Sequence, residues 1–358
     1  MTESIGVGVG FYNCADHSST HAIEQTGVKP ELPNSQLKAR SRSRALNYQL
    51  PKTKVGGRRS SYRRLHLRSC MDLSETPIHN ISDTARWVAV YRTRESQRPD
   101  AIFRDPFAER LAGNRGKQIA ASMPFAEKSS FSFVARTWLT DQLITEQVRA
   151  GVEMVVNLAA GLDARPYRMD LRRSLQWVEV DLPEILAYKG EVLRNEKPVC
   201  ALEQVRLDLS NAEARRELFS RLGQRAKRVL VVTEGLLVYL TEEEVTALGN
   251  DLAAQPAFQH WIIDVMSPAL LKMLRRKMTA PLDQAGIPLK FAPQTGPEFF
   301  KRCGWKPEQV DSILHAAARM RRLPLLLHLI AMISPERFQP NRPWSGVCLM
   351  GNSQASEK

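Results

Sequence analysis

Four acidic side chains stand at the ends of apolar runs, and their type and spacing could do chemistry. Asp163 follows "VVNLAAGL", Asp181 ends "VEVD", Asp208 ends "VRLD" and Glu234 ends "VVTE". Carboxylates accept hydrogen bonds from hydroxyl, amine and ammonium groups. Ligands of open parallel sheets bind beyond the carboxyl ends of the strands. These four residues are therefore the candidates for binding a ligand.

The turn after the first apolar run excludes one class of ligand. Gly161 would let a ligand approach the backbone closely. A GxGxxG dinucleotide fingerprint would overlay this turn as AxGxxA, without its first glycine. Asp163 would also repel a pyrophosphate at the start of the next helix. Asp163 could instead only cap that helix, and under either interpretation the turn disfavours NAD and FAD.

The second and third acids suit a nucleoside. Asp181 lies twenty residues beyond Gly161, about the spacing at which nucleotide-binding folds present an acid to ribose hydroxyls. Asp208 could accept a hydrogen bond from an exocyclic amine while Leu209 packs on a purine face. The alternative for each acid is helix capping, at Pro183 for the first and at "NAEARRELF" for the second.

Glu234 is the acid least suited to a surface role, because it lies between the apolar runs "VLVV" and "LLVYL". Burying a carboxylate there costs several kcal/mol unless it is paired. Glu234 could hold a cation, such as the ammonium of an amino-acid moiety. A nucleoside joined to an amino acid fits all four acids, and S-adenosylmethionine is such a molecule.

The elements that must position these residues are predicted to be an N-terminal helical segment followed by an α/β sheet. Helices are predicted at "SDTARWVAVYRTRES", "RDPFAERLAG" (with Asp105 as cap, Pro106 first and Gly113 as terminator) and "FSFVARTWLTDQLITEQVRAG". Strands and helices then alternate, which indicates a doubly wound, mostly parallel sheet covered on both faces. Six strands are expected, at "MVVNLAA", "LQWVEVDL", "QVRLDL", "RVLVVTEG", "HWIIDVM" and "GVCLMG".

Composition excludes several other classes. The 358 residues are 43% hydrophobic and 25% charged, which is ordinary for a globular protein. The five cysteines are scattered without CxxC spacing, which argues against a disulfide framework or a metal site and indicates a reducing cytoplasm. The longest apolar stretch, 323–333, is too short to span a bilayer, so we expect no membrane partner.

The net charge of +13 is concentrated at the N-terminus. Residues 1–70 contain 12 Lys/Arg and 4 Asp/Glu and show no amphipathic period, so we predict a disordered basic extension over 1–75. It could be an RNA-binding arm or an import presequence. We favour a third interpretation, with the natural start at Met71, because no methionine lies between Met1 and Met71. No nucleic-acid partner is therefore expected.

A series of ordered segments resembles the leucine carboxyl methyltransferase-like family: "ISDTARWVAVYRTRES" with "DPFAERLAG", then "FVARTWLTDQLI", "VVNLAAGLDARPYR", "WVEVDLPEILAYK", "VRLDL" and "VVTEGLLVYLTEEEV". The branch is similar to bacterial enzymes that include the tetracenomycin polyketide O-methyltransferase. The resemblance covers roughly residues 80–350. It implies a class I methyltransferase fold with S-adenosylmethionine as cofactor. It also implies a helical lid at 76–152, a cofactor-binding domain at 153–354, and an acceptor-pocket wall at 281–343.

By motif match, the resemblance also implies roles for individual residues. Asp181 would take the ribose hydroxyls, Asp208 and Leu209 would flank adenine, and Gly161 would lie under the methionine part. Arg136 would meet the cofactor carboxylate, and Glu234 would lie near the amino-acid or ribose side, with Asp163 also at the cofactor. The sequence departs from the family at Ala159, where the family usually has a glycine, and the added methyl could crowd the cofactor.

The function expected is O-methylation of a carboxylate or hydroxyl of a small molecule. Outside the N-terminal extension there are four histidines, none in a recognisable motif, and no catalytic residue is assigned; they are His79, His260, His315 and His328. Two alternatives stay open: an NAD(P)-dependent oxidoreductase, and a nucleic-acid-binding protein that acts through the basic extension. The oligomeric state and the acceptor are not predicted.

Overall fold

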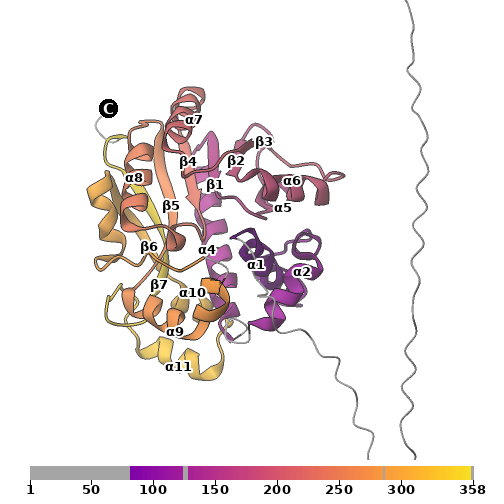
Figure 1. Ribbon diagram of the computed structural model, residues 1–358, viewed down its shortest axis with the longest axis vertical. Helices are drawn as coiled ribbons and strands as arrows, with labels where there is room; N and C mark the ends of the chain where they lie inside the picture. Colours follow the sequence, from indigo (N-terminus) through magenta and orange to yellow (C-terminus); the bar gives the residue numbers. More distant parts are fainter. Residues whose placement is uncertain (1–80, 124–127, 285–286, 356–358) are drawn as a thin grey trace, which may run out of the picture. The chain divides into compact units, whose positions relative to one another are not determined.

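A seven-stranded mixed sheet forms the centre of the computed structural model, which describes residues 81–123, 128–284 and 287–355 (Figure 1). The order is β3-β2-β1-β4-β5-β7-β6, with β7 antiparallel to both of its neighbours. The sequence order reverses between β1 and β4, so the predicted doubly wound topology is confirmed. The strands are β1 (Met154–Leu158), β2 (Gln176–Asp181), β3 (Ala201–Arg206), β4 (Val229–Thr233), β5 (Phe258–Met266), β6 (Trp305–Ser312) and β7 (Ser345–Asn352).

The central strands form because their residues are apolar on both faces. Every residue of β1 ("MVVNL") and β4 ("VLVVT") is buried, as expected for a parallel sheet covered on both sides. Val156 pairs with Val178 of β2 on one side and with Val231 of β4 on the other. This register aligns the carboxyl ends of the three strands along one edge.

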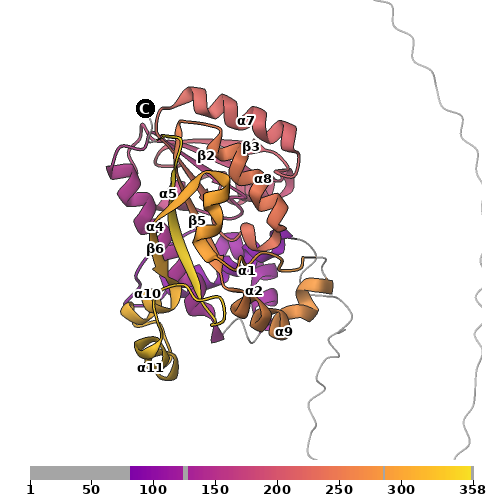
Figure 2. The same ribbon diagram turned by 90° about the vertical axis from the view of Figure 1, so that its left-hand side faces the viewer.

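Helices cover both faces of this sheet. α4 and α10 pack on one face, and α7, α8 and the 3-10 helix η2 pack on the other. Figure 2 shows α4 and α8 on opposite sides of the strands. The helices are α1 (Ile81–Ser96), α2 (Ala108–Ser122), α4 (Ser130–Arg149), α5 (Arg165–Arg168), α6 (Pro183–Val192), α7 (Ala212–Arg225), η1 (Leu237–Tyr239), α8 (Glu242–Ala253), α9 (Pro268–Gln284), η2 (Gly296–Cys303), α10 (Ile313–Arg319) and α11 (Leu325–Ile333).

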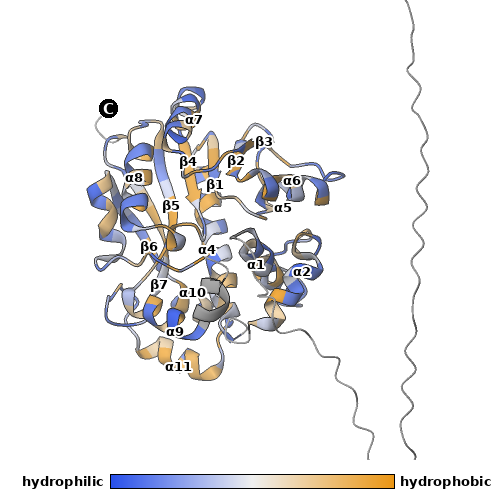
Figure 3. Ribbon diagram, in the orientation of Figure 1, coloured by the Kyte–Doolittle hydropathy of each residue, from blue (hydrophilic) through white to orange (hydrophobic). Residues whose placement is uncertain are grey.

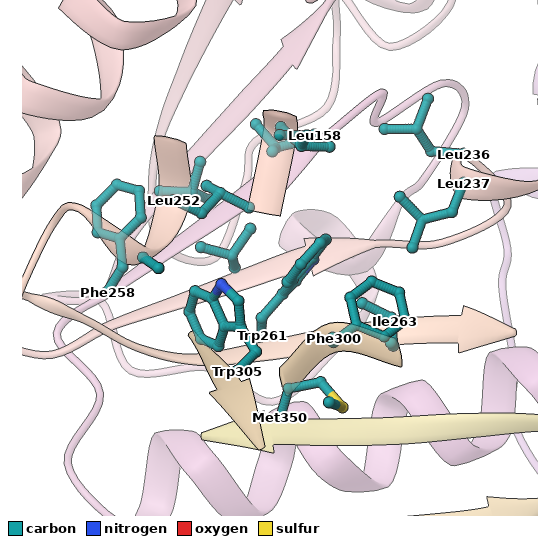
Figure 4. Packing of buried hydrophobic residues seen from close by; sticks show 14 of the residues in the cluster. Leu158, Leu236, Leu237, Leu252, Phe258, Trp261, Ile263, Phe300, Trp305 and Met350 are labelled. Carbon is teal, nitrogen blue, oxygen red and sulfur yellow. The ribbon is translucent and has the colours of Figure 1, made fainter. Parts of the chain in front are cut away.

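Aromatic residues fill the core between the sheet and the α8 face (Figure 4). Trp261 meets Phe300 and Trp305 edge-to-face, with ring centroids 5.4 and 5.5 Å apart. The indole Nε1 of Trp305 donates to the Gly249 carbonyl at 3.0 Å, and that of Trp261 donates to the Thr233 hydroxyl at 3.0 Å. The polar atoms of these large rings are therefore satisfied where they are buried.

The sequence missed β6 and misjudged two helices. β6 is an edge strand with mostly exposed residues and with Pro307 inside it, so it lacks the apolar run that marked the other strands. α5 is only four residues long, because the chain becomes extended at Met169. α2 begins at Ala108 rather than at Pro106, and Gly113, at φ +59°, interrupts the helix without ending it.

α1 and α2 pack together at the carboxyl edge of β1, where the lid was predicted. α4 does more than a lid would, because Leu139, Leu143 and Ile144 belong to the core on the sheet. The predicted extension at 1–75 lies outside the described residues. Within the described parts of the chain, no helix is both long and apolar enough to cross a membrane.

Candidate functional site

A cavity of about 470 Å³ lies at the carboxyl ends of the central strands. α1 and α4 line it together with the segments that follow β1, β2, β3 and β4. All lining residues lie between Ser82 and Leu248. The described residues of 281–343 therefore contribute nothing to this cavity, and the acceptor-wall prediction for that segment has no support from it.

The β1 turn explains why small residues follow the first strand. Gly161 has φ +51°, and a Cβ added there would lie 3.2 Å from Ala85 Cβ on α1. The close approach that Gly161 permits is thus made by the N-terminal helix. Ala159 also has positive φ, +52°, a conformation that costs a non-glycine residue about 1–2 kcal/mol. The alanine that replaces the family's glycine therefore carries backbone strain and lines the cavity.

Asp181 holds this turn from the end of β2. Its Oδ2 accepts the Gly161 N–H at 2.6 Å, and its Oδ1 accepts the Leu182 N–H at 2.7 Å. Burial raises the pKa of Asp181, against the effect of these two amide bonds. The N-cap of α6 is Leu182, without a side-chain cap, so the capping alternative for Asp181 is wrong. Asp181 lines the cavity, with lone pairs left for other donors.

Asp208 and Leu209 follow β3 and also line the cavity. Asp208 is exposed, and its Oδ1 accepts the Ser210 N–H at 2.9 Å. The N-cap of α7 is Asn211, whose side chain accepts the Ala214 N–H. The capping alternative for Asp208 is therefore wrong. Leu209 is half-buried and packs against the core.

Asp163 is engaged by protein groups on both oxygens. Oδ1 accepts the Arg165 N–H at 2.9 Å, while Oδ2 accepts from Asn157 Nδ2 and Arg165 Nη1, each at 2.8 Å. Burial would raise the pKa of Asp163, but the charges of Arg165, Lys189 and Arg168 hold it well below its usual range. The N-cap of α5 is Ala164, so Asp163 is not the cap. A four-residue helix that begins beside this carboxylate offers no pyrophosphate site.

Glu234 lies between two arginines. Its Oε1 accepts from Arg136 Nε at 3.1 Å and its Oε2 accepts from Arg165 Nη2 at 2.7 Å. Burial would raise the pKa of Glu234, but these two guanidinium groups lower it. An ammonium group would have to share oxygens that already accept from arginine. The contacts therefore give Glu234 the role of fixing Arg136 and Arg165 in addition to any contact with a ligand.

The side chain of Arg136, on α4, lies between the carboxylates of Glu234 and Asp264. Its Nη1 lies 3.3 Å from Asp264 Oδ2, and the Asp264 Oδ1 accepts the Gly235 N–H at 2.6 Å. Gly235 has φ +72°, and a Cβ there would lie 3.2 Å from Arg136 Nη1. No described residue accepts a hydrogen bond from Arg136 Nη2. One nitrogen of this half-buried guanidinium is thus open to a ligand at the cavity.

Arg165 was not predicted from the sequence, yet it makes more ionic contacts than any other residue of the site. Besides Asp163 and Glu234, its guanidinium binds Asp141 on α4 at 2.6 Å, and Arg168 binds the same carboxylate at 2.8 Å. Nothing in "DARPYR" alone distinguishes Arg165 from a surface arginine. Asp264 was also missed, although an acid inside the apolar run "WIIDVM" was a signal of the kind used for Glu234.

Aromatic residues form the wall on the α1 side. Trp87 and Phe133 line the cavity with ring centroids 5.1 Å apart, and Tyr91 stacks on Phe133 from behind at 5.0 Å. Burial raises the pKa of Tyr239, which also lines the cavity, so its hydroxyl stays protonated at neutral pH. None of the described histidines lines this cavity, and the described residues contain no cluster of three or more metal-ligating side chains.

Comparison with known proteins bears on the family of this chain. Residues 85–253 match the family model described as leucine carboxyl methyltransferase. A Streptomyces coelicolor protein, provisionally named an S-adenosyl-L-methionine-dependent methyltransferase, is 34% identical over 49% of this chain and 65% of its own length. The chain thus matches just under two thirds of that relative. A Frankia alni protein of the same provisional name is 31% identical over 55% of this chain and 76% of its own length.

Among solved structures, a provisionally assigned methyltransferase from Thermobifida fusca is 13% identical with a TM-score of 0.47, over 78% of this chain and 96% of its own. The residues that match the family model include the β1 turn, the acids after β2 and β3, and Glu234. This chain therefore belongs to the leucine carboxyl methyltransferase family.

Proposed function

We propose that this protein is an S-adenosylmethionine-dependent O-methyltransferase that acts on a carboxylate or hydroxyl group of a small molecule. One observation carries the proposal. A single cavity brings together Asp181, Asp208 and Leu209 on the β2–β3 side with Arg136 on the β4 side. Along the sheet order β3-β2-β1-β4, these groups match a purine, a ribose and an amino-acid carboxylate, which is the order in which S-adenosylmethionine carries them.

The charges around the cavity also suit this molecule. In the network that joins α4, the segment after β1 and the ends of β4 and β5, three arginines (Arg136, Arg165 and Arg168) are paired with the carboxylates of Asp141, Asp163, Glu234 and Asp264. The surplus is one negative charge. S-adenosylmethionine bears an ammonium, a sulfonium and a carboxylate, so its net charge is complementary.

The residues would divide the work of binding as follows. Asp181 accepts ribose hydroxyls, since a carboxylate oxygen that receives one amide N–H still has a free lone pair. Arg136 donates through Nη2 to the amino-acid carboxylate, a charge-assisted bond, while Glu234 and Asp264 fix the guanidinium. When bound, the cofactor supplies a methyl group that its sulfonium has already made electrophilic.

The chain's own contribution to transfer is therefore alignment and exclusion of water. Ala85 of α1 closes over the β1 turn, while Trp87 and Phe133 form an apolar wall that extends toward Arg136. A carboxylate acceptor is ionised at neutral pH and needs no general base. For a hydroxyl acceptor, the protonated Tyr239 offers a hydrogen bond rather than a base.

The first experiment is calorimetric titration of S-adenosylmethionine and of its demethylated product into the wild type, Asp181→Ala and Ala159→Gly. Micromolar binding by the wild type, weakened about tenfold or more in Asp181→Ala, would support the proposal. Binding by Ala159→Gly alone would indicate a degenerate methyltransferase. Absence of binding by both would contradict the cofactor assignment.

The oxygen acceptor is tested separately, with a methyl-labelled cofactor and a panel of carboxylic acids and phenols. Label that mild base releases as methanol identifies a methyl ester, while base-stable label identifies a methyl ether. Label found only on nitrogen or sulfur acceptors would contradict O-methylation and leave the cofactor assignment intact.

A further inference from the structure

α11 is the most exposed apolar element among the described residues. Six of its nine residues are large apolar side chains exposed to solvent, from 38% for Ile330 to 84% for Ile333; the others are Leu325, Leu326, Leu329 and Met332. Only Ala331 is buried in this helix. Apolar patches of this kind are rare on soluble monomers and mark interaction surfaces. Figure 3 shows α11 as a continuous hydrophobic segment at the margin of the fold.

This exposure is not the fraying of a loose end, because both ends of α11 are tied to the fold. Before the helix, Arg322 pairs with Glu95 of α1 at 2.8 Å and is itself buried. After it, the Ser334 carbonyl contacts His315 Nε2 at 3.1 Å, and the Glu336 carbonyl accepts from Trp344 Nε1 at 2.9 Å. The chain thus holds an apolar helix facing outward at a fixed place.

The surroundings of α11 are basic. Residues 319–342 contain five arginines and one acid, Glu336. Arg319 pairs with Glu336 and Arg322 with Glu95, while no described acid pairs with the other three, Arg321, Arg337 and Arg342, all exposed. Arginines that frame exposed leucine, isoleucine and methionine are typical of a helix lying in the interface of an anionic membrane.

Charge disfavours two other occupants of this face. In a two-fold contact, a second copy would place the same arginines against each other. The N-terminal 70 residues carry 12 Lys/Arg against 4 Asp/Glu, so the frame of arginines would repel them as well. A negatively charged apolar surface is the occupant that satisfies both parts of the patch.

We propose that α11 docks the protein on an anionic lipid surface, with Leu326 and Ile333 in the acyl region and Arg321 and Arg337 at the headgroups. The expectation of no membrane partner considered only whether 323–333 could span a bilayer, and a helix lying in the interface needs no such length. β6 is parallel to β5, so α10 and α11 follow from the carboxyl edge of the sheet, and α11 lies at the lower margin of the fold in Figures 1 and 2. Docking would therefore bring lipid to the edge that holds the cavity.

The test is flotation of the full chain with vesicles of phosphatidylcholine alone and of equal parts phosphatidylcholine and phosphatidylglycerol. We expect binding to the mixed vesicles that falls about tenfold or more in the double variant Leu326→Gln/Ile333→Gln, because two buried apolar side chains are lost. Arg321→Gln and Arg337→Gln should each weaken binding about fivefold. Val199→Gln, which removes an apolar side chain 37% exposed elsewhere, should change nothing.

Three outcomes would overturn the proposal. The first is that the wild type does not float with the mixed vesicles. The second is that the double variant floats as well as the wild type, which would assign binding to the basic N-terminal segment. The third is a wild-type dimer in sedimentation that the double variant loses, which would assign the face to a second copy. Calorimetric binding of S-adenosylmethionine should be the same in all variants, so failure here is distinct from failure of the proposed function.

Discussion

The two sides of the cavity use carboxylates in opposite ways. On the β4 side, both oxygens of Glu234 accept from guanidinium groups, and Asp264 pairs with Arg136. On the β2–β3 side, Asp181 and Asp208 accept only from backbone amides in the described structure. Both sides looked alike in the sequence, as acids at strand ends.

The difference separates acids that hold the site together from acids that face a ligand. Removing a buried carboxylate whose charge is paired with arginine strongly destabilises the fold, because the arginine is left charged and unpaired. A carboxylate bonded by one amide on each oxygen keeps acceptor capacity for hydroxyl groups. Variants on the β4 side should therefore act mainly on stability, and variants on the β2–β3 side mainly on cofactor affinity.

The largest effect is expected from Arg165→Met. It leaves Asp141, Asp163 and Glu234 without a shared counter-charge in a buried place, which costs about 3–5 kcal/mol in the free energy of unfolding. Urea denaturation measures it. The control is Arg194→Met, whose exposed pair with Glu191 should be worth less than about 1 kcal/mol. Equal, small losses in both variants would show that the network is not structural.

Acid should weaken the same network. Arginine charges lower the folded-state pKa values of Asp163 and Glu234 despite burial, so their contribution is present above the unfolded pKa and is lost as pH falls through the lower folded values. Burial raises the pKa of Asp181 and of Asp264, and these two groups act in the opposite direction. Because the pKa of Asp163 is shifted most strongly among these groups, we expect a net loss of stability below about pH 4, measured by urea denaturation. Asp163→Asn should make the free energy of unfolding less dependent on pH. A variant whose stability falls with pH as steeply as that of the wild type would contradict this prediction.

Asp181→Asn and Glu234→Gln compare the two sides directly. Asp181→Asn should weaken cofactor binding about tenfold, or about 1.4 kcal/mol. The change in stability should be smaller, because the amide oxygen can still accept the Gly161 N–H and only the Leu182 N–H loses its acceptor. Glu234→Gln should mainly lower stability, because it leaves the charges of Arg136 and Arg165 less compensated. Calorimetry and urea denaturation of both variants test the division. The reverse pattern would mean that Glu234 is the ligand-facing acid.

The smallest effect is expected at the β1 turn. Ala159→Gly removes the strain of a left-handed backbone at φ +52°, but glycine loses more conformational entropy on folding than alanine does. The net effect should be a rise of about 1 kcal/mol in the free energy of unfolding. Thermal denaturation against the wild type measures it. Gly161→Ala is the matched counterpart and should destabilise, because its Cβ would meet Ala85 as well as adopt positive φ. Stabilisation by Gly161→Ala would show that α1 does not close over this turn.

The sequence by itself determined the fold class and the placement of the acids. Near-continuous Val/Ile/Leu runs predicted β1, β2, β4 and β5, because strands buried on both faces can be built from little else. Asp163, Asp181, Asp208 and Glu234 were found because each follows such a run. β6 was missed because a polar edge strand carries no comparable pattern.

Only the tertiary structure decided which acid does what. Glu234, Asp163 and Asp141 are far apart in sequence, and they meet because one arginine, Arg165, reaches all three. The exposure of α11 was equally hidden, since its apolar residues would fit a buried helix as well as a surface one. Local patterns report which residues avoid water, whereas pairing and exposure depend on what the rest of the chain places beside them.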